Sequence, residues 1–165
     1  MNEELLKKAI NCLSINDIYL HESNINIEES FDPIQPGFDN LDVQFRHGVK
    51  KAQILEVSTG EDNLIKILKV FFSVGFRILP PDLEKETQDD VEKMNAQVLA
   101  EVSAVFTADY YLDCEETEVD KDAIDVFVQN NVGYHVWPYW REYVHSVSDR
   151  VRLPRVTVPL YKIPK

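Results

Sequence analysis

Hydrophobic residues alternate with polar ones along most of the chain, and helical spacing is confined to its two ends. The runs with the period of two that is typical of strands are residues 18–31, 41–57, 64–79 and 97–113. The clearest helical spacing comes first, at residues 3–13. The pattern therefore predicts a short helix followed by four strands.

Two further helices are predicted after the last strand. The first covers residues 120–131, and Asn131 and Gly133 are typical of its end. The second begins at Pro138, because proline suits the first position of a helix. Its apolar side chains recur at helical spacing until Leu153 and Pro154 stop it.

Local features indicate how the strands are connected. The alternation slips near Gly48, which predicts a bulge in the second strand. Residues 58–63 are a turn cluster, so the second and third strands are expected to form a hairpin. The strand at 64–79 is apolar on both faces over part of its length, which predicts cover on both sides from helices or another subunit.

This order of elements indicates an α+β fold, with a four-stranded antiparallel sheet and helices on one face. We expect one domain over residues 1–165, and we expect it to be oligomeric. Its parts are a short helix at 1–14, the sheet at 15–113, helices at 120–152 and an extended tail at 153–165.

Charge narrows the classes of partner. The chain holds 17 Lys and Arg against 29 Asp and Glu, a net charge of −12. Nucleic-acid affinity rests on basic residues that neutralise phosphates, so we expect no nucleic-acid partner. Six of the basic residues but only two of the acidic ones follow residue 133, so the strands and their connections carry the negative charge.

The compartment is predicted from the cysteines and the N-terminus. The first residues are acidic and polar, unlike a secretory signal, and no apolar run reaches the roughly 18 residues of a membrane span. Cys12 and Cys114 could form one disulfide, but two free thiols are the expected state. We therefore predict a cytoplasmic protein without membrane insertion.

Catalytic chemistry is not indicated by any motif. The five glycines are scattered, and the four histidines show no metal-binding spacing. The acidic run at 113–120 lacks the glycine and the final glutamate of a calcium loop, so we expect a solvated loop there. The prediction is a protein that is not an enzyme and needs no metal or cofactor.

One region resembles a known family. Pro138, Tyr139, Arg141 and Glu142 start a helix, and Leu153-Pro154 and an alternating apolar strip at 156–160 follow it. This arrangement resembles the SecB family of export chaperones, as do Ile18-Tyr19 in the first strand and the order of four strands before the helix. The resemblance covers about residues 15–160.

The resemblance implies an ATP-independent holdase that forms homotetramers, as dimers of dimers, and binds unfolded polypeptides in apolar grooves. Some members deliver clients to the SecA motor, and SecB-like members guard antitoxins in toxin–antitoxin systems. The alternative is a non-enzymatic interaction module that binds one folded partner. The chain departs from the family in its additional first helix, its long acidic connection at 80–97 and its end at Lys165, and the last of these puts SecA delivery in doubt.

The resemblance also suggests site residues. A client groove between the main helix and the crossover loop would use Phe31, Ile34, Phe38, Phe127, Tyr134, Val136 and Trp137. Each of these could instead fill the core, and Phe127 is expected there. An acidic dock for a basic partner would use Asp42, Glu101 and Asp109, although a solvated face is the simpler interpretation.

Overall fold

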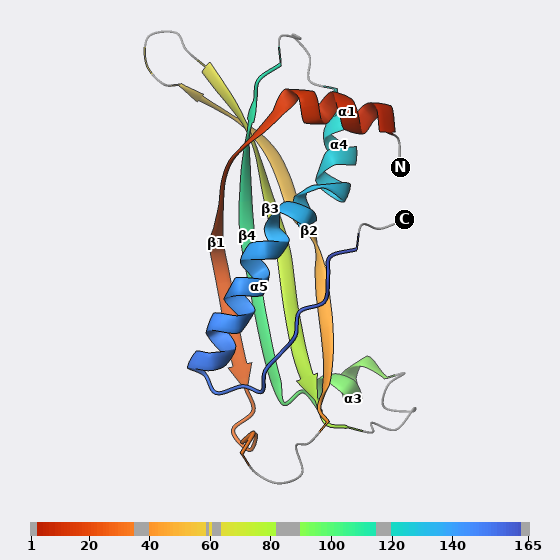
Figure 1. Cartoon of the computed structure of the whole chain (residues 1–165), viewed down its shortest axis with the longest axis vertical. Coiled ribbons are helices and arrows are strands. Elements are labelled where there is room, and N and C mark those ends of the chain that lie inside the picture. The colour runs from red at the N-terminus through yellow and green to blue at the C-terminus, as the bar shows by residue number, and fades with distance from the viewer. Residues whose placement is uncertain are drawn as a thin grey trace.

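The fold is taken from a computed structural model (Figure 1), which describes residues 3–34, 40–58, 60, 64–81, 90–114 and 120–162. In chain order the elements are α1 (Glu3–Cys12), β1 (Leu13–Ile27), β2 (Asp42–Ser58), β3 (Leu64–Leu79), α3 (Val91–Asn95), β4 (Ala100–Leu112), α4 (Lys121–Asn130) and α5 (Val132–Arg150). The α+β class and the four strands predicted from the alternation are confirmed.

The strands form one antiparallel sheet in the order β1-β4-β3-β2, which leaves β1 and β2 at its edges. The predicted β2–β3 hairpin is confirmed. Its register shifts between Val49 and Lys51, within three residues of Gly48, where the alternation slips. The extra residue returns the apolar side chains of β2 to the same face, because a shift of one residue reverses the side of every later residue.

Helix α5 lies across one face of the sheet, and the main core lies between them (Figure 1). The largest fully buried side chains of this core include Phe76, Tyr110 and Trp140. The opposite face carries the other parity of β3, where Ile67, Lys69 and Phe71 are half-buried. Cover was predicted for both faces of this strand. Within the described residues of this chain it is found on the α5 face, whereas the side chains on the opposite face are only half-buried.

Pro138 lies inside α5, so its predicted place at the first helical position is wrong. The helix begins six residues earlier and follows α4 after the single residue Asn131. Proline lacks the N–H that would bond the carbonyl of Tyr134. Both residues are on the exposed side of the helix, where water can bond that carbonyl instead.

Cys12 and Cys114 form a disulfide, so the expectation of free thiols is also wrong. The cause is the pairing of β1 with β4, because Leu13 lies opposite Leu112 and brings the two cysteines beside each other. The N–H of Asp113 also donates to the Cys12 carbonyl. This junction holds α1 near α4, where Lys8 pairs with Asp120 at 3.4 Å.

The acidic connection before β4 contains the short helix α3. The Asp90 carboxylate accepts hydrogen bonds from the backbone N–H groups of Glu92 and Lys93, which is the usual way to start a helix. Residues 96–99 then lead into β4. This helix was missed because only five residues adopt it.

Candidate functional site

The structure distributes the predicted groove residues along the molecule. Phe31 is buried and Ile34 is 79% exposed, and both lie in the segment after β1, at the opposite end of the sheet from α4 (Figure 1). Phe38 lies outside the described residues. Phe127, Val136 and Trp137 are buried on α4 and α5, and Tyr134 is exposed.

Phe127 occupies the core, as expected. Its ring stands edge-on to Tyr110 at 5.1 Å, and the Tyr110 hydroxyl is 3.0 Å from Nδ1 of His135. Burial raises the pKa of Tyr110 and lowers the pKa of His135. Both side chains are therefore favoured in their neutral forms, in which the phenol can donate a hydrogen bond to Nδ1. Phe127 helps to exclude water from this hydrogen bond.

Residues 153–162 form an extended segment that runs back beside α5 toward β2 (Figure 1). We call this the C-terminal segment. The chain turns at Arg152, whose φ is +56°, and the N–H of Leu153 donates to the Ser148 carbonyl. Leu153 and Val158 are buried, whereas Leu160 is 76% exposed. The segment therefore inserts selected side chains between the helix and the sheet.

Trp137 is the centre of the contact with this segment. Its Nε1–H donates to the carbonyl oxygen of Pro159 at 2.8 Å, and its ring lies 5.1 Å from that of Tyr161. His47 of β2 lies 5.3 Å from both rings and stacks on Phe72. Burial lowers the pKa of His47, which keeps this aromatic cluster uncharged at neutral pH.

Gly133 provides room for Tyr161. A Cβ atom built on Gly133 would overlap the phenol ring, so this close approach of the segment to α5 requires glycine. We call the surface formed by Gly133, Trp137, His47 and Phe72 the tail channel. The prediction that Gly133 ends a helix is wrong, because this residue lies in the first turn of α5 and serves the contact instead.

The C-terminal segment is held mainly by side chains. Among the described residues, no backbone-to-backbone hydrogen bond joins residues 154–162 to another part of the chain. An extended segment without such bonds can leave its site at a lower free-energy cost than a strand in a sheet. The tail channel therefore accommodates an extended polypeptide without pairing it into the sheet.

Of the tail channel, only Trp137 was among the predicted groove residues, and Gly133, His47 and Phe72 were not. Pro159 and Tyr161 of the C-terminal segment were not predicted either. A signal was present in the alternation of Val156 and Val158 before Pro159, which indicates an extended segment with one apolar side. The sequence did not show against which surface that side packs.

The predicted acidic dock lies on the sheet face opposite α5. Asp109 contacts Lys69 at 2.7 Å with both side chains mostly buried, and Glu101 contacts Arg46 at 3.0 Å. Burial opposes protonation of Lys69, but hydrogen bonds to Asp109 and Tyr19 raise its pKa. Asp42 is exposed. Two of the three carboxylates therefore have basic partners, and the dock stays a prediction.

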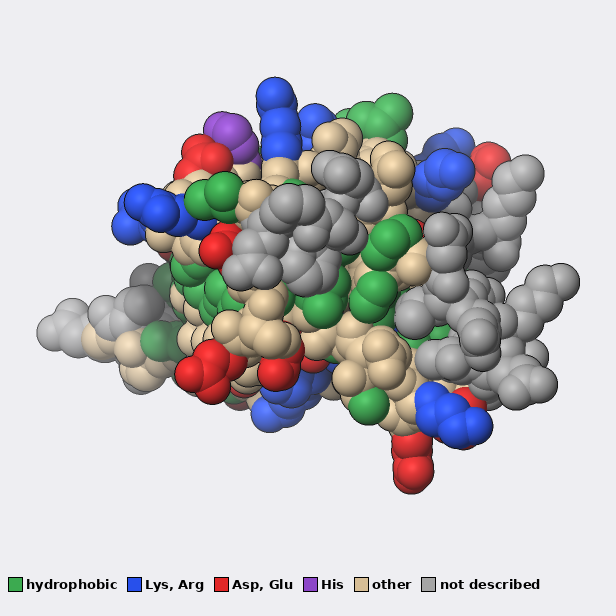
Figure 2. Space-filling model, turned by 90° about the horizontal axis from the view of Figure 1, so that it is seen from below, with side chains coloured by type: hydrophobic (Ala, Val, Ile, Leu, Met, Phe, Trp, Pro, Cys, Tyr) green, Lys and Arg blue, Asp and Glu red, His purple; other side chains and the backbone are tan. Residues whose placement is uncertain are grey.

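Charges of both signs are mixed on the end of the molecule that carries the loop after β1. Figure 2 shows acidic and basic side chains interspersed there with hydrophobic ones. Within the described residues, no group of three His, Cys, Asp or Glu side chains could hold a metal ion. In the same part of the chain, no helix has the length and apolar character needed to cross a membrane.

One comparison with known proteins agrees with the fold. No protein-family model matches the chain, and no curated protein sequence matches it either. A solved structure, the SecB-like chaperone Rv1957 of Mycobacterium tuberculosis in complex with a ChAD peptide from the Rv1956 HigA1 antitoxin, is similar with a TM-score of 0.67. The sequences are 17% identical, and the match covers 98% of this chain and 99% of that one. The chain therefore has a SecB-like fold. This fold was predicted for about residues 15–160 from the Pro138 region and the order of elements.

Proposed function

We propose that this protein is a chaperone of the holdase type, which binds unfolded polypeptides without ATP and thereby prevents their aggregation. The observation that carries the proposal is the tail channel, where Trp137 and His47 bind an extended segment of the chain itself. The similarity to a SecB-like chaperone supports it, because that protein is solved with a peptide bound.

In this proposal a client binds by replacing the C-terminal segment in the tail channel. The chemistry of the present occupant indicates what fits: an extended segment with apolar side chains at alternating positions and an aromatic ring for the site beside Gly133. The Trp137 indole donates to a backbone carbonyl, which every client has. Recognition therefore demands an apolar pattern and no particular sequence.

The other predicted groove residues extend this site. Ile34 is exposed at the far end of α5, and Tyr134 is exposed near its start. A client that occupies the tail channel would reach these two side chains only if it continues beyond the channel along the helix. These positions would be supported from the core by Phe31, Phe127 and Val136. Phe38 is included because of the resemblance to the SecB family.

The test is an aggregation assay with a chemically denatured client, without nucleotide. A molar excess of the purified chain should suppress light scattering during dilution of the client from denaturant. Scattering that is unchanged at any excess would remove the holdase proposal. A parallel measurement with several unrelated denatured clients separates the alternatives, because a holdase binds many unfolded chains, whereas an interaction module binds one folded protein.

A second role within the same activity is protection of an antitoxin. The specific observation is that the similar structure contains an antitoxin peptide. The test is co-expression of the chain with the antitoxin of a toxin–antitoxin pair, chosen from beside its gene if such a pair is encoded there. A longer antitoxin half-life would favour this role. An unchanged half-life, together with slower export of precursor proteins in cells that lack the chain, would favour export through SecA.

We also propose that the working form is a homotetramer. Within the described chain, the outer edges of β1 and β2 have no partner strand, and β1 exposes the apolar side chains Ile15, Leu20 and Ile25 toward the α5 side. Unpaired edges with apolar side chains favour association of copies. The solution mass from light scattering tests this assembly, and a monomer at working concentration would contradict it.

A further inference from the structure

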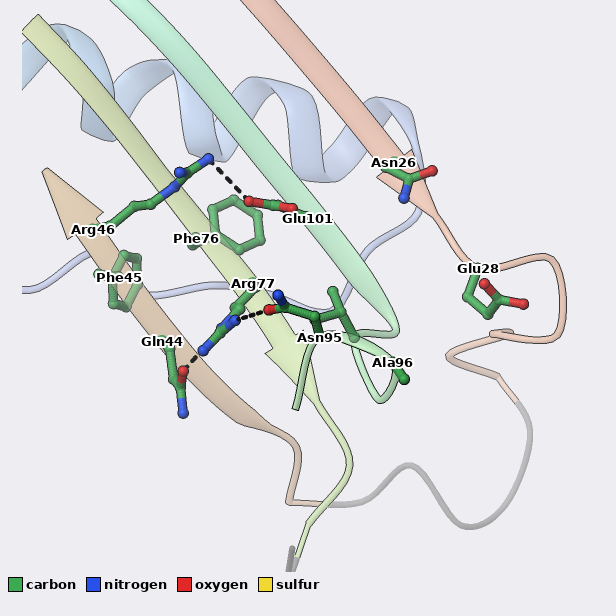
Figure 3. Close-up of a pocket in the computed structure, with 11 residues that line it drawn as sticks. Asn26, Glu28, Gln44, Phe45, Arg46, Phe76, Arg77, Asn95, Ala96 and Glu101 are labelled. Carbon is green, nitrogen blue, oxygen red and sulfur yellow. Dashed lines mark hydrogen bonds and ion pairs between the residues drawn. The ribbon is translucent and has the colours of Figure 1, made fainter. Parts of the chain in front are cut away.

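A cavity of about 750 Å³ lies on the sheet face opposite α5, and its chemistry differs from that of the tail channel (Figure 3). One row of side chains lines it across all four strands: Asn26 of β1, Glu101 of β4, Arg77 of β3 and Gln44 of β2. Asn95, Ala96 and Val98 line it from the segment around the end of α3. The cavity is therefore lined mainly by polar groups.

Arg77 and Glu101 lie directly opposite each other on adjacent strands, yet they do not form an ion pair. Glu101 pairs with Arg46 at 3.0 Å. The Arg46 side chain reaches it by crossing over Gly75, where a Cβ atom would lie 3.0 Å from Nε of Arg46. The carboxylate nearest to Arg77 in the register is thus engaged by another cation.

Neutral groups hold the Arg77 guanidinium instead. Nε donates to Oε1 of Gln44 at 2.9 Å, Nη1 donates to Oδ1 of Asn95 at 3.0 Å, and Nη2 donates to Sδ of Met94 at 2.8 Å. Within the described part of the chain, Arg77 forms no ion pair. Its side chain is half-buried, so this cation has lost part of its water without gaining a carboxylate.

These bonds also determine which way the two amides point. A guanidinium has only donors, so the oxygens of Gln44 and Asn95 must face Arg77. Their NH2 groups then face away from it, as Figure 3 shows for Gln44. The two amides, the remaining N–H groups of Arg77 and the free part of the Arg46 guanidinium together give this side of the cavity a surplus of donors.

From this arrangement we propose that the cavity binds a carboxylate group carried by an acidic polypeptide segment. A carboxylate accepts only, carries the charge that Arg77 lacks and forms charge-assisted hydrogen bonds with a guanidinium. The cavity is much larger than one carboxylate and lies within the range of ligand sites, which favours a segment of chain over a small ion.

Glu28 opposes such a ligand. It lines the cavity on the far side of Asn95 and Ala96 from Arg77, and it is exposed (Figure 3). Its charge repels a carboxylate but does not reach the Arg77 side unscreened, because exposed charges are screened by salt. Removal of this charge should therefore strengthen binding, which a purely structural role of the cavity would not predict.

The test is a titration of the full chain with the blocked peptide acetyl-Gly-Glu-Glu-Gly-amide, followed by calorimetry or NMR. We expect binding at least tenfold tighter than that of the glutamine analogue, acetyl-Gly-Gln-Gln-Gly-amide. Arg77→Gln should weaken binding at least tenfold and Glu28→Gln should strengthen it about twofold. Lys66→Gln removes a cation from the other end of β3, where Lys66 pairs with Glu56, and should leave affinity within twofold.

Equal binding of the two peptides, or full binding by Arg77→Gln, would overturn the proposal. Glutarate is the probe for a small carboxylate, and binding as tight as that of the peptide would overturn the assignment to a polypeptide. Asn95→Ala removes one donor and one restraint on Arg77, and it replaces Arg77→Gln if that variant does not fold. The cavity and the tail channel lie on opposite sheet faces, so neither result decides the holdase assay.

Discussion

The phenol ring of Tyr161 fills the space beside α5 that a Cβ atom at Gly133 would need. This contact joins a residue of the first turn of α5 to one beyond its end. It predicts that the effect of Gly133→Ala on stability changes sign when Tyr161 is replaced. Gly133→Ala should destabilise the native chain, because insertion into a packed contact typically costs about 1–3 kcal/mol. In a Tyr161→Ala background the same change should stabilise the chain by up to about 1 kcal/mol, through the helix propensity of alanine.

The measurement is a double-mutant cycle by urea unfolding, which isolates the coupling between the two sites. Tryptic cleavage after Arg155 should also be faster in Gly133→Ala than in the native chain, since the C-terminal segment is released. A Gly133→Ala effect of the same sign in both backgrounds would show that Tyr161 does not occupy this space in solution.

Tail-channel occupancy sets the apparent affinity for clients. If the C-terminal segment and a client compete, the apparent dissociation constant is the intrinsic value divided by the fraction of molecules with a free channel. Tyr161→Ala weakens only the internal competitor and should strengthen client binding about threefold to tenfold. Trp137→Ala removes the surface that both use and should weaken it. Fluorescence anisotropy with a labelled unfolded client measures both, and Leu160→Ala, at an exposed position of the same segment, is the control.

Stability should fall as the pH is lowered through about 6.5. Burial lowers the pKa of both His47 and His135 below the ordinary value of 6.5, so the unfolded chain binds protons that the folded chain does not. This contribution is complete above the unfolded pKa and is lost as the pH falls toward the folded pKa. Urea midpoints between pH 5 and 8 measure the slope. His47→Gln should flatten the curve, whereas replacement of the exposed His145 should leave it steep.

The disulfide should contribute strongly to stability. Cys12 and Cys114 are 102 residues apart, and a cross-link over such a distance removes unfolded-state entropy worth up to about 4–5 kcal/mol in the chain-entropy treatment. Cys12→Ser and Cys114→Ser should lower the unfolding midpoint equally, and dithiothreitol should lower that of the native chain but of neither variant. A thiol titration of the unreduced native chain that finds two free thiols would contradict the pairing.

Two ion pairs on the face opposite α5 should differ in their effect on stability. The Lys69 and Asp109 side chains are 18% and 12% exposed, whereas those of Arg46 and Glu101 are 64% and 40% exposed. Asp109→Ala leaves a largely buried ammonium unpaired and should cost about 3–5 kcal/mol. Glu101→Ala breaks an exposed pair and should cost less than about 1 kcal/mol. Thermal unfolding of both variants at low salt measures the difference between the two losses of stability. Equal losses would mean that the burial of Lys69 does not affect the strength of its ion pair.

Much of the fold was predictable because periodicity records local exposure. The run at 64–79 predicted β3 with its bounds, and the slip near Gly48 predicted the shift at Val49 and Lys51. The start of α5 was not predictable in this way. Proline at a first helical position is a statistical preference, and the packing of Val132 and Val136 into the core extends the helix past it.

The candidate site was less predictable than the fold. Trp137 was identified through a resemblance, but its partner Pro159 lies 22 residues away, and no local pattern shows that the carbonyl returns to the indole. Likewise, the sequence could not show that Glu101 turns to Arg46 and leaves Arg77, because that choice depends on the absence of a side chain at Gly75 between them.

By itself the sequence determined the number and kind of the main elements, the faces of the strands and the resemblance to SecB. These properties follow from the order of side chains along a helix or strand, where neighbours in space are neighbours in the chain. Tertiary structure alone decided the strand order, the pairing of Cys12 with Cys114, and the return of residues 153–162 to the surface of α5. Each of these joins residues far apart in the sequence, and such contacts are selected by the packing of the whole molecule.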